Sequence, residues 1–495
     1  MSAYAKLEQL FHKRSVLSGA SAILHWDNAV MMPDGGAESR SEQLATLGLM
    51  SHELLKGPAV ENWLEEASSE TLDEWQTANL REMNNQWRHG NAVEGSLVEA
   101  LSRATSQCEM TWRAAREEND FSVLQEELEK VVSLTQEMAM AKAEAFGVTA
   151  YDALLDQFEP GCTAEAIDVL FDDLGAFLPG FLDQVLEKQR VNGRGEKPEG
   201  PFPIEVQRDL GEAFMRALTF DFNHGRLDTS HHPFTGGTPD DVRLTTRYEE
   251  DDFTQSLMGT LHETGHALYE QNLPLKWRHQ PVGQARGMAM HESQSLLIEM
   301  QLSRGPEFLQ YAIPIIRDAF KGEGENWTFA NLKQFYHRVE RGFIRVDADE
   351  VTYPLHVILR YRLEKALLSG DLKVKDLPGA WNEGMMSLLG VTPPNDRLGC
   401  LQDIHWPGGA IGYFPTYTMG ALAAAQLFEA ARNDLSNMNA DIRAGKFEPL
   451  VGWLKKHVHQ MGSLKSTDQM LEDATGKKMG TDAFKVHLTD RYLKG

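Results

Sequence analysis

The sequence has few cysteines and no long apolar run. Its three cysteines, Cys108, Cys162 and Cys400, are far apart in the chain. An odd, sparse count is typical of a reducing compartment and argues against a disulfide framework. The first residues lack the apolar segment of a secretory signal, and the most apolar late stretch, residues 410–431, is interrupted by polar residues, glycine and proline. We therefore expect a cytoplasmic protein with no membrane-spanning segment.

Positive charge is also scarce. The 48 lysine and arginine residues are outnumbered by 73 aspartate and glutamate residues, which gives a formal net charge of −25. A surface of this sign repels phosphate backbones, so nucleic acid is not expected as a partner. An apolar fraction of 42% is enough for a sizeable core, and large helical enzymes of 495 residues often form one unit. We expect a single domain over residues 1–495.

Apolar residues recur with helical period over most of the chain. A Pro/Gly-rich stretch at residues 191–203 predicts a loop, and a second loop is predicted near residues 390–412. Residues 221–253 differ, because turn residues separate β-favouring runs there, which predicts a small antiparallel ribbon. Helices are expected again from Phe253. The fold class is therefore mainly α, with one small ribbon just before the most informative helix.

That helix contains the motif LHETGHALYE at residues 261–270. His262 and His266 are four residues apart, so both imidazoles project from one face of a helix and suit two ligands of a tetrahedral zinc ion. Glu263 follows the first histidine and can take a proton from a metal-bound water. The alternative is a purely structural histidine pair, because the motif also arises by chance.

A third ligand must come from elsewhere. Glu270 is about 12 Å along the helix axis from His262, at ~1.5 Å per residue, and cannot reach the same ion. The segment HESQSLLIEM, residues 291–300, reads as a second amphipathic helix. Glu292 near its start could face the first helix, with Glu299 and His291 as rivals, and spacing alone does not choose between them. Two histidines and one glutamate leave a fourth position open for water, as in catalytic zinc sites.

The chain resembles the carboxypeptidase Taq family of metallocarboxypeptidases, and the resemblance extends over most of the sequence. It is carried by eight motifs in order: HWDNAVMMPDGG at 25–36, HPF at 232–234, Asp241-Val-Arg243-Leu-Thr245, HETGH at 262–266, His291-Glu292-Ser293, IRVDAD at 344–349, Gly399 to Trp406 with QDIHW, and GYFPTYTMG at 412–420. No motif position departs from the family pattern.

The resemblance implies a helical fold like that of neurolysin and angiotensin-converting enzyme, with an N-terminal lobe over about 1–200 and a catalytic lobe over about 201–495. It implies metal-dependent release of single residues from the C-termini of peptide substrates, with broad tolerance and resistance of C-terminal proline. It also implies a homodimer. The implied metal ligands are His262, His266 and Glu292, with Glu263 as the catalytic carboxylate. We expect Zn²⁺, with Co²⁺ as an acceptable replacement.

Peptide hydrolysis also needs donors for the oxyanion. His405 in QDIHW is the leading candidate, unless it is a buried histidine bonded to Asp403. Tyr417 in the following loop is the second candidate. Tyr413 is the fallback donor and is counted among the substrate-binding residues.

An exopeptidase further needs a cation for the free carboxylate of its substrate, and the planar fork of arginine suits that group. Arg345 is the first choice, with Asp347 and Asp349 as local partners that could orient it. Arg243 with Asp241 is the second choice for substrate binding, unless the two form only a structural ion pair.

Two competing functions remain open from the sequence. One is an endopeptidase of the related oligopeptidase type, which would still cleave peptides with amidated C-termini. The other is a non-catalytic helical scaffold with a metal site, against which the intact Glu263 argues.

Overall fold

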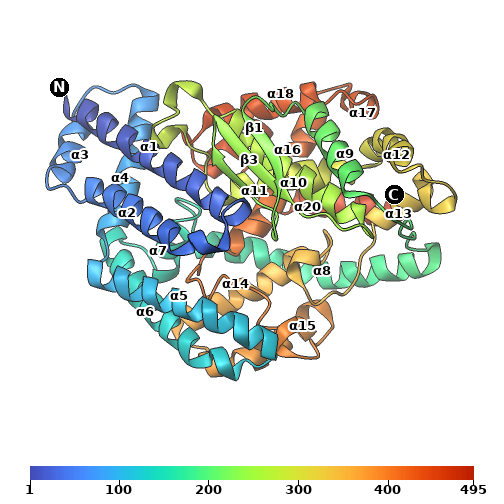
Figure 1. The fold of residues 1–495 in the computed structure, drawn as a ribbon, viewed down its shortest axis with the longest axis horizontal. Coiled ribbons are helices and arrows are strands. Elements are labelled where there is room, and N and C mark those ends of the chain that lie inside the picture. The colour runs from blue at the N-terminus through green and yellow to red at the C-terminus, as the bar shows by residue number, and fades with distance from the viewer. Residues whose placement is uncertain (495) are drawn as a thin grey trace.

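Helices make up most of the chain, as the sequence period predicts, and the computed structural model describes residues 1–494 (Figure 1). The α-helices are α1 (Ala3–Val30), α2 (Ala37–Leu55), α3 (Val60–Ser68), α4 (Glu74–Asn91), α5 (Gly95–Glu118), α6 (Ser122–Phe146), α7 (Ala150–Leu155), α8 (Ala164–Asn192), α9 (Ile204–Ala217), α10 (Phe253–Gln271), α11 (Met288–Leu296), α12 (Pro306–Phe320), α13 (Phe329–Tyr336), α14 (Tyr353–Ser369), α15 (Leu377–Leu389), α16 (Pro415–Asp434), α17 (Met438–Arg443), α18 (Glu448–His457), α19 (Thr467–Thr475) and α20 (Asp482–Leu488).

A three-stranded sheet lies between α9 and α10 in sequence, built from β1 (Gly225–Thr229), β2 (Thr235–Thr238) and β3 (Asp241–Thr246). Strands β2 and β3 form the predicted antiparallel ribbon. The sequence analysis did not predict that β1 would pair with β3 in parallel, which gives the order β1-β3-β2. Because β2 takes one edge of β3, β1 can pair only along the other edge, where the two strands run the same way.

The helix α10 starts at Phe253, where the sequence predicts it. The Asp252 side chain caps it by accepting a hydrogen bond from the Thr254 backbone N–H at 2.8 Å. One face of α10 buries Leu257, Leu261 and Leu268 in the core. The helix packs against β3 and against α11, and α11 in turn packs against α16. These three helices form the layer that carries the candidate site.

Two glycines allow these helices to approach closely. A Cβ atom on Gly265 of α10 would lie 2.3 Å from the carbonyl oxygen of Gln294 in α11. A Cβ atom on Gly420 of α16 would lie 2.8 Å from the Cβ of Glu292. Since any larger side chain would overlap these atoms, α11 is held tightly between its two neighbours.

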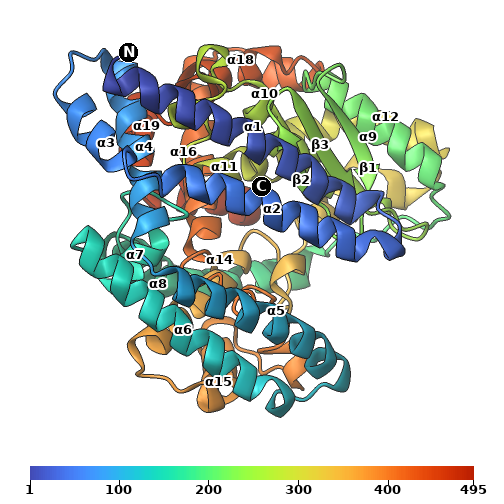
Figure 2. The same cartoon turned by 60° about the vertical axis from the view of Figure 1, so that its left-hand side comes forward.

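The remaining helices form two further groups. Helices α5, α6, α8, α14 and α15 lie together in the lower half of Figures 1 and 2, and α14 packs on both α6 and α8. Helices α1 to α4 share a smaller apolar cluster, and α1 runs along β2 (Figure 2). The largest apolar cluster joins residues from Ala104 to Tyr492, so segments before and after residue 200 share one core. Among the described residues, no helix combines the length and the apolar character that crossing a membrane requires.

The glycine contacts generate a prediction about stability. Gly265→Ala should lower the melting temperature, because overpacking against the α11 backbone costs roughly 1–3 kcal/mol. Gly259→Ala on the same helix is the matched control, because a Cβ there meets no atom within 4 Å and alanine gains up to about 1 kcal/mol in helix propensity. Thermal unfolding followed by circular dichroism checks both variants. Equal stability of the two would contradict the close helix approach.

Candidate metal centre

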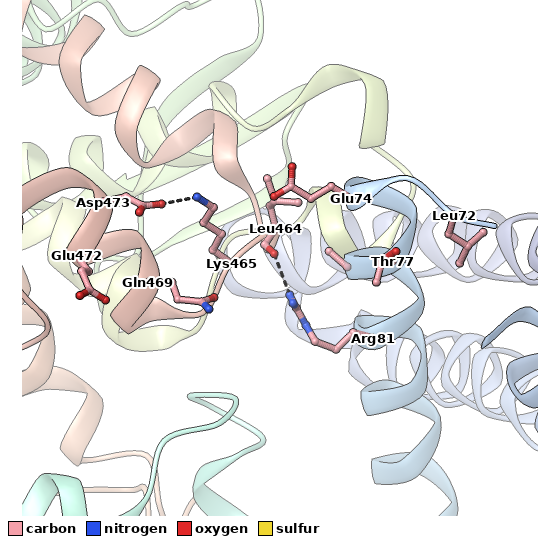
Figure 3. A pocket seen from close by; sticks show the side chains of 10 residues that line it. Leu72, Glu74, Thr77, Arg81, Leu464, Lys465, Gln469, Glu472 and Asp473 are labelled. Atoms are coloured by element: carbon pink, nitrogen blue, oxygen red, sulfur yellow. Dashed lines mark hydrogen bonds and ion pairs between the residues drawn. The ribbon is translucent and has the colours of Figure 1, made fainter. Parts of the chain in front are cut away.

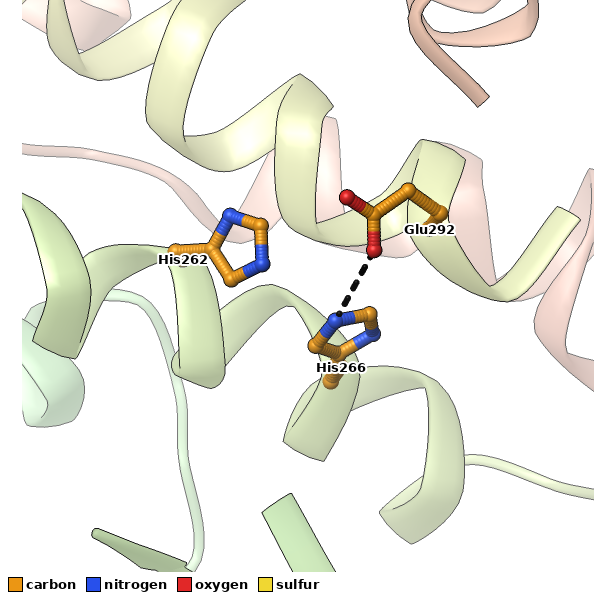
Figure 4. A group of neighbouring side chains, drawn as sticks. All are labelled: His262, His266 and Glu292. Atoms are coloured by element: carbon orange, nitrogen blue, oxygen red, sulfur yellow. Dashed lines mark ion pairs between the residues drawn. The ribbon is translucent and has the colours of Figure 1, made fainter. Parts of the chain in front are cut away.

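Three potential ligands converge where α10 faces α11. Candidate ligand atoms of His262, His266 and Glu292 all lie within 4.8 Å of one another. Figure 4 shows both imidazoles rising from α10 and the Glu292 carboxylate reaching them from α11. The Nε2 atom of His266 is 3.4 Å from Oε2 of Glu292. The structure thus brings together the two histidines and the glutamate that the sequence analysis named.

The donor set fits a divalent cation. Two ligands of a tetrahedral zinc ion, each about 2.0–2.1 Å from it, are separated by about 3.3 Å, close to the His266–Glu292 distance. The Nδ1 atoms of both histidines are engaged elsewhere, since that of His262 contacts Glu299 and that of His266 contacts the carbonyl of His291. With Nδ1 engaged, Nε2 of each ring is left for a metal ion.

Glu299, one of the rivals, lies behind His262. Its Oε2 is 3.0 Å from the His262 Nδ1, and its Oε1 accepts a hydrogen bond from Arg304 at 2.7 Å. Glu299 belongs to η4 (Leu297–Ser303), a π-helical continuation of α11 in the segment where the sequence predicts an uninterrupted helix. The contact orients the His262 ring, as outer carboxylates do for metal-binding histidines.

His291, the other rival, lies behind His266. Its Nε2 is 2.9 Å from Oε1 of Glu270, and its ring stacks on that of His266 with a centroid separation of 4.6 Å. Glu270, which helix geometry excludes from the metal, thus contacts a residue that supports His266. Both histidines of the motif therefore have an acidic residue behind them, one directly and one through His291.

The carboxylates around His262 favour a positive charge there, whereas burial lowers the pKa of His266. Burial lowers the pKa of His262, but the hydrogen bond to Glu299 and the charges of Glu292 and Glu263 outweigh this and raise the pKa to about 10. Burial raises the pKa of Glu292, yet contact with His266 and the charge of His262 lower it to about 2. A divalent cation would supply the positive charge that these acidic groups stabilise.

Glu263 is buried on the same helix and has a partner in the sheet. The hydroxyl of Thr235 in β2 donates to its Oε2 at 2.7 Å and also contacts its backbone carbonyl at 3.1 Å. Thr235 directly follows the HPF motif, whose chemistry the sequence does not reveal. The position of Thr235 next to this motif was the one sequence signal for its role. No local pattern, however, links Thr235 to a helix 28 residues away.

His405, Tyr413 and Tyr417 form a second group. His405 and Tyr413 lie on the loop before α16, whereas Tyr417, expected in a loop, lies in the first turn of α16 because the helix already begins at Pro415. The His405 Nε2 and the Tyr417 hydroxyl are 3.2 Å apart, and the Tyr413 and Tyr417 rings meet edge to face at 5.2 Å. Burial is the main cause that lowers the pKa of His405 to about 4, so its ring is neutral at neutral pH. Its Nδ1 is 3.9 Å from Asp403, too far for the hydrogen bond considered as the alternative.

Arg345 is buried beside this second group. Its Nε and Nη2 donate to Oδ1 of Asp403 at 3.2 and 3.0 Å, and Arg360 donates to Oδ2 of the same carboxylate. The guanidinium lies 4.8 Å from the centre of the Tyr417 ring. Among the described residues its Nη1 has no hydrogen-bond partner, so part of the fork is free.

The prediction that Asp347 and Asp349 orient Arg345 is wrong. Asp347 is exposed, and Asp349 accepts hydrogen bonds from backbone N–H groups, including those of Val351 and Thr352 at 3.0 Å. The Asp349 carboxylate is therefore engaged in the turn that leads into α14. The orienting partner is Asp403, which is 58 residues away in the chain.

Arg243 and Asp241 form a bidentate ion pair on β3. The Nε and Nη2 atoms of Arg243 donate to the two Asp241 oxygens at 2.9 and 2.6 Å. The Trp26 ring of α1 covers the guanidinium at 4.5 Å. Arg243 bonds through Nε and Nη2, as Arg345 does, but it has both oxygens of Asp241 to itself, whereas Arg345 shares Asp403 with Arg360.

A different hollow lies between α4 and the start of α19 (Figure 3). Its two cations are already engaged, since Lys465 pairs with Asp473 and Arg81 donates to the carbonyls of Ser463 and Leu464 at 2.6 and 3.3 Å. No histidine lines it. Its chemistry does not compete with that of the metal centre.

Substitution of Glu292 and substitution of Glu299 should affect the metal affinity of the protein to different extents. Glu292→Gln removes a charged ligand and should abolish stoichiometric binding, whereas Glu299→Gln disturbs only the support of His262 and should weaken binding about 10–100-fold. Competition with a fluorescent chelator measures both. Retention of metal by Glu292→Gln with loss in Glu299→Gln would exchange the two roles.

Known proteins are similar to this chain along its whole length. The model of the carboxypeptidase Taq (M32) metallopeptidase family matches residues 6–492. Thermostable carboxypeptidase 1 of Thermus thermophilus is 37% identical over 511 residues, covering 99% of this chain and 98% of that protein. Carboxypeptidase 1 of Bacillus subtilis is 34% identical over 492 residues, covering 98% and 96%.

Solved structures agree. Metallocarboxypeptidase 1 of Trypanosoma cruzi superposes with a TM-score of 0.97 at 39% identity, and the match covers 99% of both chains. The M32 carboxypeptidase of Deinococcus radiodurans gives 0.94 at 32% identity, with 99% of both chains covered. The chain therefore belongs to the carboxypeptidase Taq (M32) metallopeptidase family.

Proposed function

We propose that this metallocarboxypeptidase releases single C-terminal amino acids with Zn²⁺ as its metal ion, held by His262, His266 and Glu292. The observation that carries the proposal is the convergence of two imidazoles and one carboxylate within 4.8 Å, with a second acidic side chain, that of Glu263, on the helix that carries both histidines. Co²⁺ would be accepted by the same ligands.

A bound zinc ion supplies Lewis-acid polarisation of the scissile carbonyl and lowers the pKa of water. Glu263 accepts the proton of the attacking water and later gives it to the leaving amine. The hydrogen bond from Thr235 to Oε2 holds one oxygen of this carboxylate, so the other is directed to the proton. Both tasks belong to one side chain because water attack and amine departure occur on the same substrate carbon.

His405 and Tyr417 donate hydrogen bonds to the developing oxyanion. A histidine whose pKa is lowered to about 4 is neutral at working pH and acts through an N–H group. Burial is the main cause that raises the pKa of Tyr417 to about 12, so its hydroxyl keeps its proton and remains a donor. Tyr413, packed edge to face on Tyr417, is the fallback donor.

Arg345 binds the terminal carboxylate of the substrate. Arg345, Arg360 and Asp403 together carry a net charge of +1 in a buried setting, so an anion is attracted there. Arg243 with Asp241 is the second choice, because its fork is already bonded to both carboxylate oxygens.

The remaining properties follow from the resemblance to the family. We infer broad side-chain tolerance, poor release of C-terminal proline and a homodimer. The three free cysteines fit a reducing cytoplasm, and the formal charge of −25 argues against nucleic acid as a partner.

Glu263→Gln tests the base. The variant keeps its size but cannot accept a proton, so it should retain about one metal ion per chain and the wild-type melting temperature while losing most of kcat. Amino-acid release from a mixed peptide set, with and without chelator, measures activity, and atomic emission measures metal. Full activity in Glu263→Gln would reject the mechanism, and chelator-resistant release would reject the metal.

Arg345 variants test the selection of chain ends. Arg345→Lys keeps the charge and loses the fork, and Arg345→Ala loses both, so kcat/KM on free-carboxylate peptides should fall in that order. The total loss should be ~2–4 kcal/mol, the range for truncating one partner of a buried charge pair. Amidated peptides should be poor substrates of wild type and variants alike.

Arg243→Ala is the matched control for the Arg345 variants, and we expect a smaller loss in kcat/KM because Asp241 alone balances the charge of Arg243. If Arg345→Ala lost activity equally on free and amidated peptides, Arg345 would support the fold and Arg243 would become the leading carboxylate partner.

A further inference from the structure

The loop that carries His405 has little regular structure of its own. Between η8 (Asp396–Leu398) and α16 it forms a series of turns, such as the hydrogen bond from Ala410 N–H to the His405 carbonyl at 2.8 Å. No strand or α-helix of the described residues includes positions 399–414. The orientation of His405 must therefore depend on contacts with other segments.

One buried carboxylate contacts this loop at two places. Glu364 of α14 is fully buried, and its Oε1 accepts a hydrogen bond from the Trp406 indole N–H at 3.0 Å. Its Oε2 accepts a hydrogen bond from the Gly412 backbone N–H at 3.2 Å. Trp406 directly follows His405, and Gly412 directly precedes Tyr413. One side chain thus holds both ends of the segment between the histidine and the first tyrosine.

The same carboxylate joins the loop to α7. The Tyr151 hydroxyl donates to Oε2 at 2.8 Å. Gly412 has a φ of +94°, and a Cβ atom there would lie 3.2 Å from the backbone nitrogen of Leu155. The loop therefore rests directly on the end of α7, and Glu364 is bonded to both partners of that contact.

Burial of this carboxylate is costly for the fold. Burial raises the pKa of Glu364 to about 7, although all three donors and the charge of Arg360 act in the opposite direction. If this carboxylate only filled space, an apolar side chain of similar volume would make the fold more stable. Its benefit is orientation, because three fixed donors converge on two oxygens.

We propose that Glu364 is a positioning residue that fixes His405, through Trp406, and the approach to Tyr413 and Tyr417, through Gly412. The inference rests on the proposed function, in which His405 and Tyr417 stabilise the oxyanion. Glu364 acts through these residues and has no contact with the metal ligands.

The test is a double-mutant cycle between Glu364→Gln and His405→Ala. Kinetics on an N-blocked dipeptide with a free carboxylate, metal content and melting temperature are measured for each variant. Glu364→Gln turns one acceptor into a donor that faces donors, so the loop should shift and kcat should fall about 10–10²-fold, the scale of small misplacements. KM and metal content should change less than about threefold, because neither the ligands nor Arg345 depend on this bond.

In the His405→Ala background, Glu364→Gln should lower kcat by less than about threefold, because only its weaker effect through Gly412 is left. Trp406→Phe removes the loop donor and should reproduce most of the loss. Tyr151→Phe is the matched control, since it removes a donor to the same carboxylate from outside the loop and should retain near-normal kcat.

Equal fold losses from Glu364→Gln in both backgrounds, or a normal kcat in Glu364→Gln while His405→Ala is impaired, would overturn the inference alone. A normal kcat in His405→Ala would instead reject the proposed role of His405, and the inference with it. If Glu364→Gln does not fold, Trp406→Phe in the two backgrounds gives the same decision.

Discussion

The close approach of α10 and α11 is the constraint on which the site depends. At Gly265 the two helices come so near that a single Cβ atom would strike the α11 backbone. On the opposite side of α11, Gly420 leaves room for the Cβ of Glu292 and little more. The segment of α11 that carries Glu292, the proposed third ligand, is therefore packed closely on both sides. Close packing of this kind limits how far the helix can move and holds its side chains in place before a ligand binds.

Charge in the site is separated into two groups. Glu263, Glu292 and Glu299 surround the two histidines and favour a cation, whereas Arg345 and Arg360 share one carboxylate, that of Asp403. The charges of both groups act on Tyr417, since Arg345 lowers its pKa and Glu292 raises it. In the function proposed above, the terminal carboxylate of a peptide binds at the cationic group and its final peptide bond lies toward the acidic one. This arrangement favours exopeptidase over endopeptidase cleavage.

The sequence predicts the parts of this site that depend on local spacing. The helical class, the β2–β3 ribbon, the start of α10 at Phe253 and the pairing of His262 with His266 on one face all follow from neighbouring residues. Spacing could not separate Glu292 from Glu299, because residues seven apart share one face of a helix. That difference comes from tertiary packing and from the π-helical segment, neither of which has a local signature.

Contacts between distant segments also cannot be predicted from local spacing, because they depend on tertiary packing. Arg345 is held by Asp403 across 58 residues, and Glu263 by Thr235 across 28. The local candidates for Arg345 failed because Asp349 accepts hydrogen bonds from backbone N–H groups in the turn before α14. Aspartate side chains commonly bond to backbone N–H groups two or three residues further along, and such a bond competes with a nearby arginine.

There is also a physical reason why the proposed metal ligands lie on helices and His405 lies on a loop. Metal ligands need fixed mutual distances, which one helix face and a tightly packed neighbour provide. The proposed oxyanion donors come from a different part of the chain, His405 from an irregular loop and Tyr417 from the first turn of the helix α16 that follows it. An irregular segment has few internal bonds to hold its shape, and buried carboxylates at Asp403 and Glu364 supply strong directional ones instead. Their desolvation lowers the net gain in stability, but it gives His405 and Tyr417 a definite orientation that apolar packing alone would not impose.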